Sequence, residues 1–212
     1  MRLVCISDTH SLHADMPPIP NGDVLIHAGD CTGTGSLAAL EDFCSWFGAL
    51  PHKNKILIAG NHDDCFERFP EESRRICETR EIIYLRGEST YIGSINFYGF
   101  PWQPIYHHMA FNAREGELRG RLKLVPEDTH VLISHGPAFG ILDYIPAINS
   151  HVGCQALADR INQLQHLKAH ICGHIHEGYG FFASESDGLK FANASTCTER
   201  YQPTNPPIVI DL

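Results

Sequence analysis

The sequence predicts an α/β protein with a mainly parallel β-sheet core and helices on the outside. Short apolar runs alternate along the chain with longer stretches in which apolar residues recur at the three- and four-residue spacing of a helix. This alternation occurs on both sides of a central hairpin region and is typical of βαβ units, whose strands are parallel and buried. No linker or low-complexity stretch interrupts it. We therefore expect a single domain over residues 1–212, with two packed sheets as an alternative to one sheet.

The N-terminal half contains the elements with the plainest signals. Leu37, Leu40 and Phe43 recur at helical spacing, which predicts a helix around them. Pro70 followed by two glutamates is typical of the first turn of another helix, where Pro and acidic side chains are both favoured. The expected elements are strands at residues 3–7, 23–28, 55–59 and 82–85, and helices at residues 36–50 and 70–79.

The C-terminal half repeats the pattern after a hairpin. Gly93 and Ser94 lie between two apolar runs, which indicates a hairpin turn. A loop containing Gly and Pro follows His135, and its length of about a dozen residues is typical of a functional loop. The expected elements are a hairpin at residues 90–98, an ordered loop at 100–108, helices at 111–124 and 154–167, and strands at 130–134, 169–172, 179–184, 189–194 and 207–211.

Side chains that bind metal ions or move protons come directly after the strand-like runs. The carboxyl ends of parallel strands meet at one edge of a sheet and line its ligand crevice, so we expect these side chains to gather there. In extended backbone, residues two apart point the same way, so Asp8 with His10, and His174 with His176, could each hold one ion. The complete set is Asp8, His10, Asp30, Asn61, His62, His135, His174 and His176.

Each of these residues also has a purely structural interpretation. A lone Asp at a strand end often caps the following helix, and a lone His is often a hydrogen-bonded surface residue. Their recurrence at one strand end after another favours a shared site. Imidazole, carboxylate and amide donors together suit Mn, Fe, Zn, Co or Ni. The set has too many ligands for one tetrahedral ion, and it suits two ions bridged by one carboxylate.

Composition limits the classes of function. The net charge is −9 with His neutral, which argues against nonspecific binding to nucleic-acid backbones. No apolar run is as long as a membrane helix, and the N-terminus starts a strand without a signal peptide. We therefore expect a cytoplasmic protein with no membrane association. None of the 8 cysteines forms a Cys-x-x-Cys pair, and we expect buried, reduced thiols.

The strand-end motifs, taken in order, resemble those of the calcineurin-like metallophosphoesterases. The similar blocks are Asp8-x-His10, Gly29-Asp30, Gly60-Asn61-His62-Asp63, His135-Gly136 and Gly173-His174-x-His176. Further segments resemble one subgroup, the metallophosphoesterase-domain-containing proteins, and extend the resemblance over nearly the whole chain. They are Pro101-Trp102-Gln103-Pro104, Val152-Gly153-Cys154, Glu177-Gly178-Tyr179-Gly180, Asn193-Ala194-Ser195 and Asn205-Pro206-Pro207-Ile208.

This resemblance implies a fold, a cofactor and a ligand set. The implied fold is a four-layer αββα sandwich, made of two mixed sheets flanked by helices. The implied cofactor is two divalent metal ions, with Mn as the first candidate and Fe, Zn, Co or Ni as the others. The implied ligands are Asp8, His10, Asp30 and His176 for one ion and Asp30, Asn61, His135 and His174 for the other, with Asp30 bridging.

The implied activity is hydrolysis of small phosphodiesters, with cyclic nucleotides among the candidate substrates. Water activated between the two ions would attack phosphorus, His62 would donate a proton to the leaving group, and Asn61 and His62 would contact the phosphate. Trp102 and Tyr106 are candidates for stacking on a substrate base, although loop aromatics are more often packing residues. A phosphomonoesterase with the same metal site and a non-enzymatic protein-binding scaffold on this fold are the alternatives. A serine or cysteine hydrolase is disfavoured, because no Gly-x-Ser-x-Gly elbow surrounds Ser134.

One departure from the family pattern concerns the residue that orients the catalytic histidine. In the related protein Ser/Thr phosphatases, an Asp three residues after the bridging Asp has this role, and here that position holds Gly33. Asp63 and Asp64 are the candidate replacements, since they follow His62 in sequence. The departure weakens an interpretation of the chain as a protein phosphatase.

Overall fold

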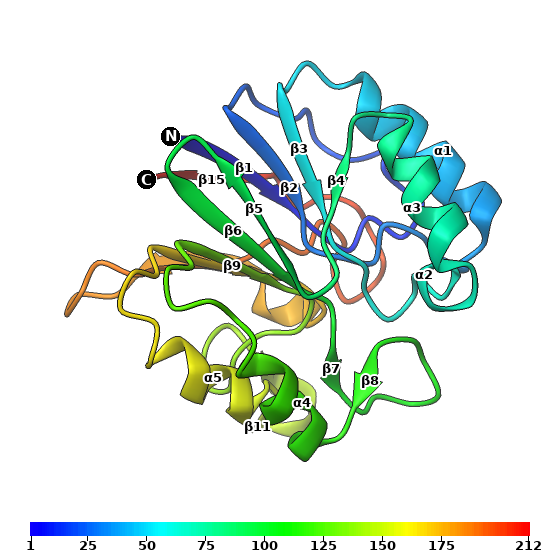
Figure 1. Ribbon diagram of the computed structural model, residues 1–212. Coiled ribbons are helices and arrows are strands. Elements are labelled where there is room, and N and C mark those ends of the chain that lie inside the picture. The colour runs from blue at the N-terminus through cyan, green and yellow to red at the C-terminus, as the bar shows by residue number, and fades with distance from the viewer.

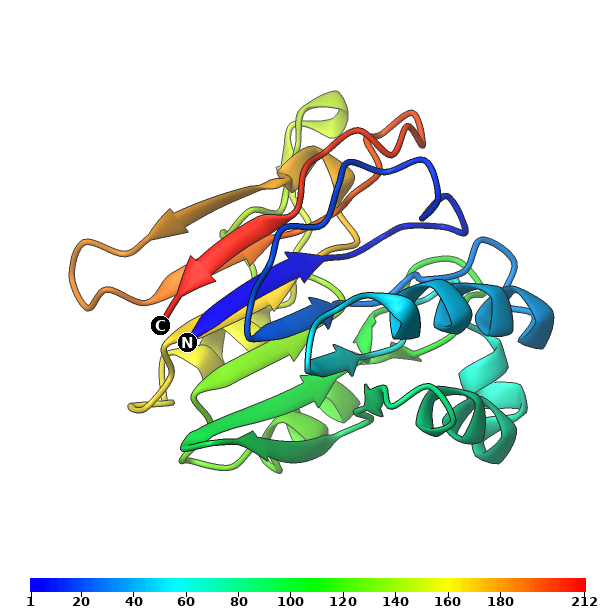
Figure 2. The same ribbon diagram turned by 90° about the horizontal axis from the view of Figure 1, so that it is seen from above.

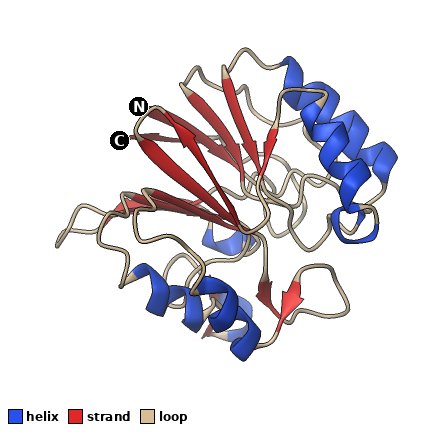
Figure 3. Cartoon of the chain, viewed as in Figure 1, coloured by secondary structure: helices blue, strands red, loops and turns tan.

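Two β-sheets pack face to face in the computed structural model, which describes all 212 residues, and helices cover the outer face of each sheet (Figure 1). In Figure 3 the two sheets, drawn in red, lie between the blue helices of the two halves of the chain. The predicted α/β class is confirmed, and so is the four-layer αββα sandwich of two mixed sheets.

The first sheet has the strand order β15-β1-β2-β3-β4 and comes almost wholly from the N-terminal half. Its four N-terminal strands are parallel, while the C-terminal strand β15 pairs antiparallel with β1. Leu3 lies opposite Val24, which lies opposite Asn54, and this register fixes where the strands end together. The strands are β1 (Arg2–Ile6), β2 (Val24–His27), β3 (Asn54–Leu57), β4 (Ile83–Tyr84) and β15 (Ile208–Asp211).

The second sheet has the order β13-β14-β12-β9-β6-β5. Its four central strands are parallel, and the two edge strands are antiparallel to their neighbours. The predicted hairpin around Gly93 is the pair β5–β6, in which Ile92 lies opposite Ile95. The strands are β5 (Glu88–Ile92), β6 (Ile95–Phe100), β9 (Val131–Ser134), β12 (Ala169–Cys172), β13 (Gly180–Ala183) and β14 (Lys190–Asn193).

Three apolar layers hold these elements together. The layer between the sheets is made of strand residues from both, because their strands are apolar on both faces. The outer face of the first sheet packs against α1 (Leu37–Ala49), α2 (Cys65–Arg68) and α3 (Pro70–Glu78). The outer face of the second packs against α4 (Glu115–Leu122) and α5 (Gln155–Ile161). The central layer includes Leu3, Ile26, Ile56, Phe97, Ile133 and Ile171.

Local sequence signals set the ends of the longer helices. The Oγ of Ser36 accepts a hydrogen bond from the Ala39 amide at 3.2 Å and so caps α1. This helix ends at Ala49 because Leu50 precedes Pro51, and a residue before Pro is disfavoured in helical conformation. Pro70 occupies the first turn of α3, as predicted.

Two predicted helices are shorter in the structure. The helix expected over residues 111–124 begins only at Glu115, because Phe111 has a left-handed φ of 56° and its carbonyl accepts the Gln103 amide. The helix expected over residues 154–167 ends at Ile161. The chain then continues in tight turns. The Leu164 amide donates to the Ile161 carbonyl, three residues earlier, and the Leu164 side chain stays buried.

Two small ladders and two 3-10 turns lie in the loops beyond the second sheet. β7 (Gln103–Pro104) pairs with β8 (Asn112–Ala113), and β10 (Tyr144–Ile145) pairs with β11 (Ser150–His151). The turns are η1 (Pro146–Ile148) and η2 (His176–Gly178). The long loop after His135 is therefore partly ordered by β10, η1 and β11. No helix of the fold has the length and apolar content that crossing a bilayer requires.

Candidate metal centre

The loops that carry the predicted ligands leave their strands at the carboxyl ends. In Figure 2 the arrowheads of the parallel strands of both sheets point to the same side of the molecule. The loops follow β1, β2 and β3 in the first sheet and β9 and β12 in the second. The two sheets are joined there, since Ser7 forms a bridge with Ser195, and the Thr196 amide donates to the Ser7 carbonyl at 2.7 Å.

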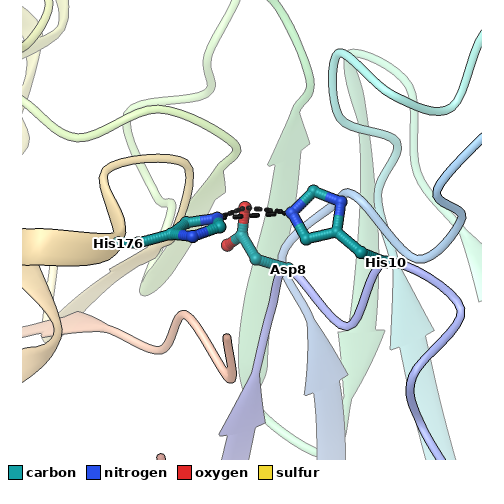
Figure 4. A group of neighbouring side chains, drawn as sticks. All are labelled: Asp8, His10 and His176. Carbon is teal, nitrogen blue, oxygen red and sulfur yellow. Dashed lines mark hydrogen bonds and ion pairs between the residues drawn. The ribbon is translucent and has the colours of Figure 1, made fainter. Parts of the chain in front are cut away.

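The first ligand group joins the start of the chain to the η2 turn (Figure 4). The Nε2 of His176 lies 3.5 Å from Oδ1 of Asp8 and 3.3 Å from Nε2 of His10. The Asp8 oxygen lies 4.0 Å from the same atom of His10. All three side chains are buried or nearly so, and their donor atoms converge on one point, which is the arrangement that a single cation needs.

The second group lies beside the first and uses residues of both sheets. The Nε2 of His135 lies 2.9 Å from Oδ1 of Asn61 and 3.4 Å from Oδ2 of Asp30. His174 completes a set with Asp30 and His135, whose ligand atoms all lie within 4.8 Å of one another. Imidazole, carboxylate and amide oxygen are thus collected around a second point.

The Asp30 carboxylate stands between the two groups. Its Oδ2 is 3.9 Å from Nε2 of His10 in the first group and 3.4 Å from Nε2 of His135 in the second. Its other oxygen, Oδ1, accepts the backbone amide of His62 at 2.7 Å. This amide bond fixes the orientation of the carboxylate, and the geometry suits a carboxylate that bridges two cations.

The backbone of several candidate ligands is held in the left-handed region. The φ angles are 52° for Asp8, 44° for His10, 56° for Asp30 and 69° for His174. Non-glycine residues there cost of order 1–3 kcal/mol each and occur mostly at functional sites. Hydrogen bonds between neighbouring loops compensate, since the Asp8 amide donates to the Gly29 carbonyl at 2.9 Å and the His10 amide donates to the Asp30 carbonyl at 3.0 Å.

This backbone corrects one argument made from the sequence. Residues two apart were expected to point the same way in extended backbone, so that each pair would hold one ion. Asp8 and His10 do share a group, but His174 and His176 belong to different groups. His174 has a left-handed φ and His176 begins the η2 turn, so neither lies in the extended conformation that the argument requires.

Glycines before the ligand residues leave room for the two groups. A Cβ on Gly173 would collide with the Asp8 carboxylate, and a Cβ on Gly60 would collide with the Asp30 carboxylate. Gly29, at a φ of 102°, lies against the ring of His135. The glycines that recur in the sequence motifs are therefore required by close approach of the carboxylates and an imidazole.

Hydrogen bonds outside the groups fix the tautomers of two imidazoles. Nδ1 of His135 donates to the Ala28 carbonyl at 3.0 Å, and Nδ1 of His176 donates to the Thr198 carbonyl at 2.9 Å. Nε2 of each ring is then the atom that faces the ligand groups. A histidine that donates its other N–H to a carbonyl is the usual arrangement for a metal ligand.

The electrostatics of the centre attract positive charge. Burial opposes ionisation of Asp8, yet its contact with His176 holds the pKa of Asp8 well below its usual range. Burial likewise opposes protonation of His135 and His176, but Asp30 and Asp8 raise their pKa values to about 9. Burial lowers the pKa of His174 to about 4, which leaves a neutral imidazole. The buried carboxylates of Asp8 and Asp30 thus favour positive charge on the imidazoles beside them. A divalent cation would supply that positive charge instead, so the donor set fits such an ion.

The candidate catalytic His62 lies beside the first group, where its ligand atom and those of His10 and Asp30 all lie within 4.8 Å of one another. Its ring is 4.6 Å from that of His10, edge to face. Nδ1 of His62 donates to the main-chain carbonyl of Gly33 at 3.2 Å, which directs Nε2 away from that bond. The residue at the unusual position therefore does orient the histidine, through its backbone rather than through a side chain.

Neither aspartate proposed for this role takes it. Asp63 is buried, and its carboxylate accepts the amides of Thr32 and Gly60, each at 2.9 Å, so it fixes the loops. The carboxylate of Asp64 pairs with Arg68 at 3.3 Å. Because every residue has a carbonyl, no side-chain pattern in the sequence could have indicated the contact with Gly33.

Comparison with known proteins identifies the family. The sequence model of the calcineurin-like phosphoesterases matches residues 1–178, which is most of the chain. The chain belongs to the calcineurin-like phosphoesterase family. This family consists of divalent-metal-dependent phosphoesterases, and the two ligand groups are its candidate metal sites in this chain.

Relatives agree with this assignment, and a solved structure has the same fold. The chain is 41% identical to human metallophosphoesterase domain-containing protein 1 over 100% of its own length and 71% of the relative's. It is 33% identical to UPF0046 protein C25E10.12 of Caenorhabditis elegans, over 100% of this chain and 81% of that protein. The crystal structure of TT1561 of Thermus thermophilus has the same fold, with a TM-score of 0.63 at 11% identity, covering 91% of this chain and 88% of that one.

This phosphoesterase has support residues around Asp8 that the sequence analysis did not assign. Oγ of Ser195 donates to Oδ2 of Asp8 at 3.0 Å. The amide of His174 also donates to that carboxylate, at 2.9 Å. Nδ2 of Asn193 donates to the Ile175 carbonyl at 2.8 Å, which holds the loop between His174 and His176. The resemblance of segment 193–195 to the family subgroup was the only signal of these residues in the sequence. Their role in supporting Asp8 became visible only from the hydrogen bonds in the structure.

A cavity of about 490 Å³ opens over both ligand groups of the phosphoesterase. His10, Asp30, Asn61 and His62 line its floor together with His174 and His176. Glu177 and Glu199 lie among the other lining residues, and neither lysine nor arginine does. Most of the remaining lining is apolar, so the cavity combines a polar floor with apolar walls.

The two aromatic candidates for stacking separate in the structure. Tyr106 lines the cavity and presents its ring to that of His174, with centroids 5.5 Å apart. Trp102 does not line it, and its ring packs against Phe100 and under the guanidinium of Arg121, 4.2 Å away. Trp102 is thus a packing residue.

Proposed function

We propose that this chain is a dinuclear metal-dependent phosphodiesterase that hydrolyses small phosphodiesters, with cyclic nucleotides among its candidate substrates. The metal-dependent phosphoesterase class follows from the family. The choice of a diester is carried by the charge of the cavity lining, which contains no lysine or arginine and includes Glu177 and Glu199. A diester carries one negative charge and a monoester close to two, so a lining with no lysine or arginine to pair the second charge favours the diester.

The metal assignment follows the two ligand groups. Asp8, His10, Asp30 and His176 would hold one ion, and Asp30, Asn61, His135 and His174 would hold the other. The convergence of Oδ2 of Asp30 on both His10 and His135 supports a bridging role for this carboxylate. Mn is our first candidate for the metal, and Fe, Zn, Co and Ni are the others, because all of them accept imidazole and carboxylate donors. When bound, the ions would supply Lewis-acid activation of water and of the phosphoryl oxygens.

His62 is our candidate general acid. Its Nδ1 hydrogen is donated to the Gly33 carbonyl, so Nε2 is the atom available to the cavity. A proton held on Nε2 can pass to the leaving oxygen of the ester, and such proton transfer is worth about 10²–10⁴ in rate. Asn61 and His62 would both contact the phosphate. In the structure Nδ2 of Asn61 donates to Sδ of Met109 at 3.1 Å.

The cellular setting is also a proposal. All eight cysteines are free and buried, which suits a reducing compartment, and we propose a cytoplasmic location with a small phosphodiester or nucleotide as partner. Nonspecific binding to nucleic acid is not expected at a net charge of −9. Membrane association is not part of this proposal.

The test is turnover by metal-stripped protein with single metals added back. Bis-p-nitrophenyl phosphate and p-nitrophenyl phosphate compare a diester with a monoester, and 2′,3′- and 3′,5′-cyclic nucleotides extend the comparison. We expect no turnover without metal and a higher kcat/KM for the diester with Mn, Co, Ni or Zn. A higher kcat/KM for the monoester would favour the phosphomonoesterase alternative. Absence of turnover despite two bound ions per chain would favour the scaffold.

A further inference from the structure

Part of the cavity lining consists of exposed or half-buried apolar side chains from the surrounding loops. Ile105 comes from the loop between β7 and β8, Ile145 from β10, Ile148 from η1 and Val152 from the segment after β11. These four residues are here called the apolar wall. Ile105 is 60% exposed and Ile148 is 62% exposed, although each lines a cavity that also contains the candidate metal centre.

We propose that the apolar wall is a subsite for an apolar ester substituent of the substrate, and that it sets the specificity of this phosphoesterase. The inference rests on the proposed function, because it takes the phosphoryl group to lie over the ligand groups in the same cavity. A substituent on phosphorus would then extend from the polar floor toward the wall. When an apolar group binds, it removes the exposed surface of these isoleucines from water, which contributes favourable binding free energy. A charged or strongly hydrated group would gain no such binding free energy there.

The loop that carries most of the wall is held by a buried carboxylate. Asp143 is fully buried and accepts the amides of Gly140 and Gly153, each at 2.9 Å, and Nδ1 of His151 at 2.6 Å. These three bonds close the loop on both sides of Ile145 and Ile148. The wall is therefore preorganised, which reduces the entropy lost when a ligand binds.

The same loop is joined to the candidate metal centre. Nδ2 of Asn193 donates both to the Leu142 carbonyl at 3.2 Å and to the Ile175 carbonyl at 2.8 Å. Asn193 thus holds the wall loop against the segment between His174 and His176. Gly178 packs against the Leu142 carbonyl so closely that a Cβ would collide with it. The distance from phosphoryl site to wall is thereby set by the fold.

The part of the apolar wall that Ile105 supplies is held by one asparagine. Oδ1 of Asn112 accepts the Tyr106 amide at 3.0 Å, and its Nδ2 donates to the Tyr106 carbonyl at 3.1 Å. These bonds hold Ile105 and Tyr106 at the cavity mouth. Two loops from different parts of the chain, each held by polar side chains, therefore present apolar surface to one space.

The proposal is tested by comparing the affinities of two monoanionic diesters, one of which has a phenyl group where the other has a methyl group. Dimethyl phosphate and methyl phenyl phosphate carry the same charge and the same phosphoryl group. We would titrate each into the Mn-loaded protein by calorimetry and check afterwards that the probe is intact. We expect methyl phenyl phosphate to bind about tenfold more tightly, because the phenyl ring removes apolar surface from water.

Variants locate the effect on the wall. Ile148→Ser and Ile105→Ser should each abolish most of the phenyl preference and leave the affinity for dimethyl phosphate unchanged. Leu124→Ser is the matched control, since Leu124 is 73% exposed and does not line the cavity. The substituted side chains are exposed, so we expect the variants to fold.

The outcomes separate this inference from the proposed function. If dimethyl phosphate binds and the phenyl ring adds no affinity, or if the wall variants keep the preference, the subsite is refuted while the phosphoesterase stands. If neither diester binds to metal-loaded protein, the proposed function fails and the inference fails with it.

Discussion

Nδ1 of His62 donates to the main-chain carbonyl of Gly33 across 3.2 Å, so a backbone atom takes the part that a carboxylate has in related phosphatases. A carbonyl fixes the tautomer and the orientation of the ring. The consequence is a candidate general acid whose ring is positioned by the main chain rather than by another side chain.

His62 can be tested with two substitutions that separate its two nitrogens. His62→Ala should keep both metal ions and lower kcat by 100-fold or more, within the ~10²–10⁴ typical of acid catalysis. His62→Asn keeps a donor for the Gly33 carbonyl but lacks Nε2, so we expect the same loss. Stopped-flow turnover and metal analysis would measure both. Recovery of activity in His62→Asn would mean that the histidine acts only by holding the Gly33 loop, and loss of both ions in His62→Ala would make it a ligand.

Asp30→Asn should reduce metal content rather than turnover alone. The change removes the negative charge whose Oδ2 lies between His10 and His135, and it leaves an acceptor for the His62 amide. We expect less than two ions per chain by atomic emission after gel filtration. Asp64→Asn is the control, because that exposed carboxylate pairs only with Arg68. Full metal occupancy in Asp30→Asn would refute the bridging assignment.

Ser195→Ala tests whether the support of Asp8 tunes the metal site. The change removes the 3.0 Å hydrogen bond to Oδ2 of Asp8, and loss of such a partner typically costs 10–100-fold in metal affinity. At saturating metal we expect kcat close to that of the unsubstituted protein. Ser184→Ala is a suitable control, since the Ser184 hydroxyl bonds the exposed Ser186 and contacts no candidate metal ligand. Equal Mn affinities for the two variants would contradict the prediction.

His170 should make the fold sensitive to acid. Burial lowers the pKa of His170 to about 3, far below the ~6.5 of an unfolded histidine. The unfolded chain therefore binds a proton as the pH falls below ~6.5 while the folded chain does not, and stability is lost in that window. For one histidine the loss between pH 7 and pH 5 is about 2 kcal/mol.

The corresponding experiment is chemical unfolding of two variants at both pH values. His170→Gln can keep the hydrogen bond that His170 makes with Oγ of Ser134 at 2.7 Å, and it should lessen the acid-induced loss by about 2 kcal/mol. His166→Gln changes an exposed histidine and should retain the original pH dependence. An unchanged pH dependence in His170→Gln would show that this ring is already charged or rearranged in the fold.

The sequence was sufficient for the architecture and for the gathering of the strand-end side chains, because both depend on long-range regularities. Apolar runs predict buried parallel strands, and the carboxyl ends of such strands must meet, so Asp30 and His135 could be placed together without coordinates. Their roles as ligands remain predictions until metal is measured. The resemblance to the family supplied the division of the ligands into two groups. The argument from extended backbone had placed His174 and His176 on the same ion, whereas they belong to different groups.

Interactions that use the backbone or single polar atoms could not be predicted. The contact of His62 with the Gly33 carbonyl has no side-chain signature, and the bond from Ser195 to Asp8 joins residues 187 positions apart. Helix ends were also misjudged where apolar spacing continued past the true boundary. Leu164 continues the apolar spacing of a helix, and its side chain is buried. Its amide, however, bonds the Ile161 carbonyl in a tight turn, so the spacing reflects burial rather than helical hydrogen bonding.

The bridge between Ser7 and Ser195 has a consequence for the lifetime of the protein. It joins the two sheets at the edge where each supplies part of the ligand set, so bound ions would act as a staple between the first and last thirds of the chain. A ligand that binds only the folded state stabilises it in proportion to the logarithm of its concentration. Cellular metal supply would then govern how much of this protein survives proteolysis, and not only how fast it works.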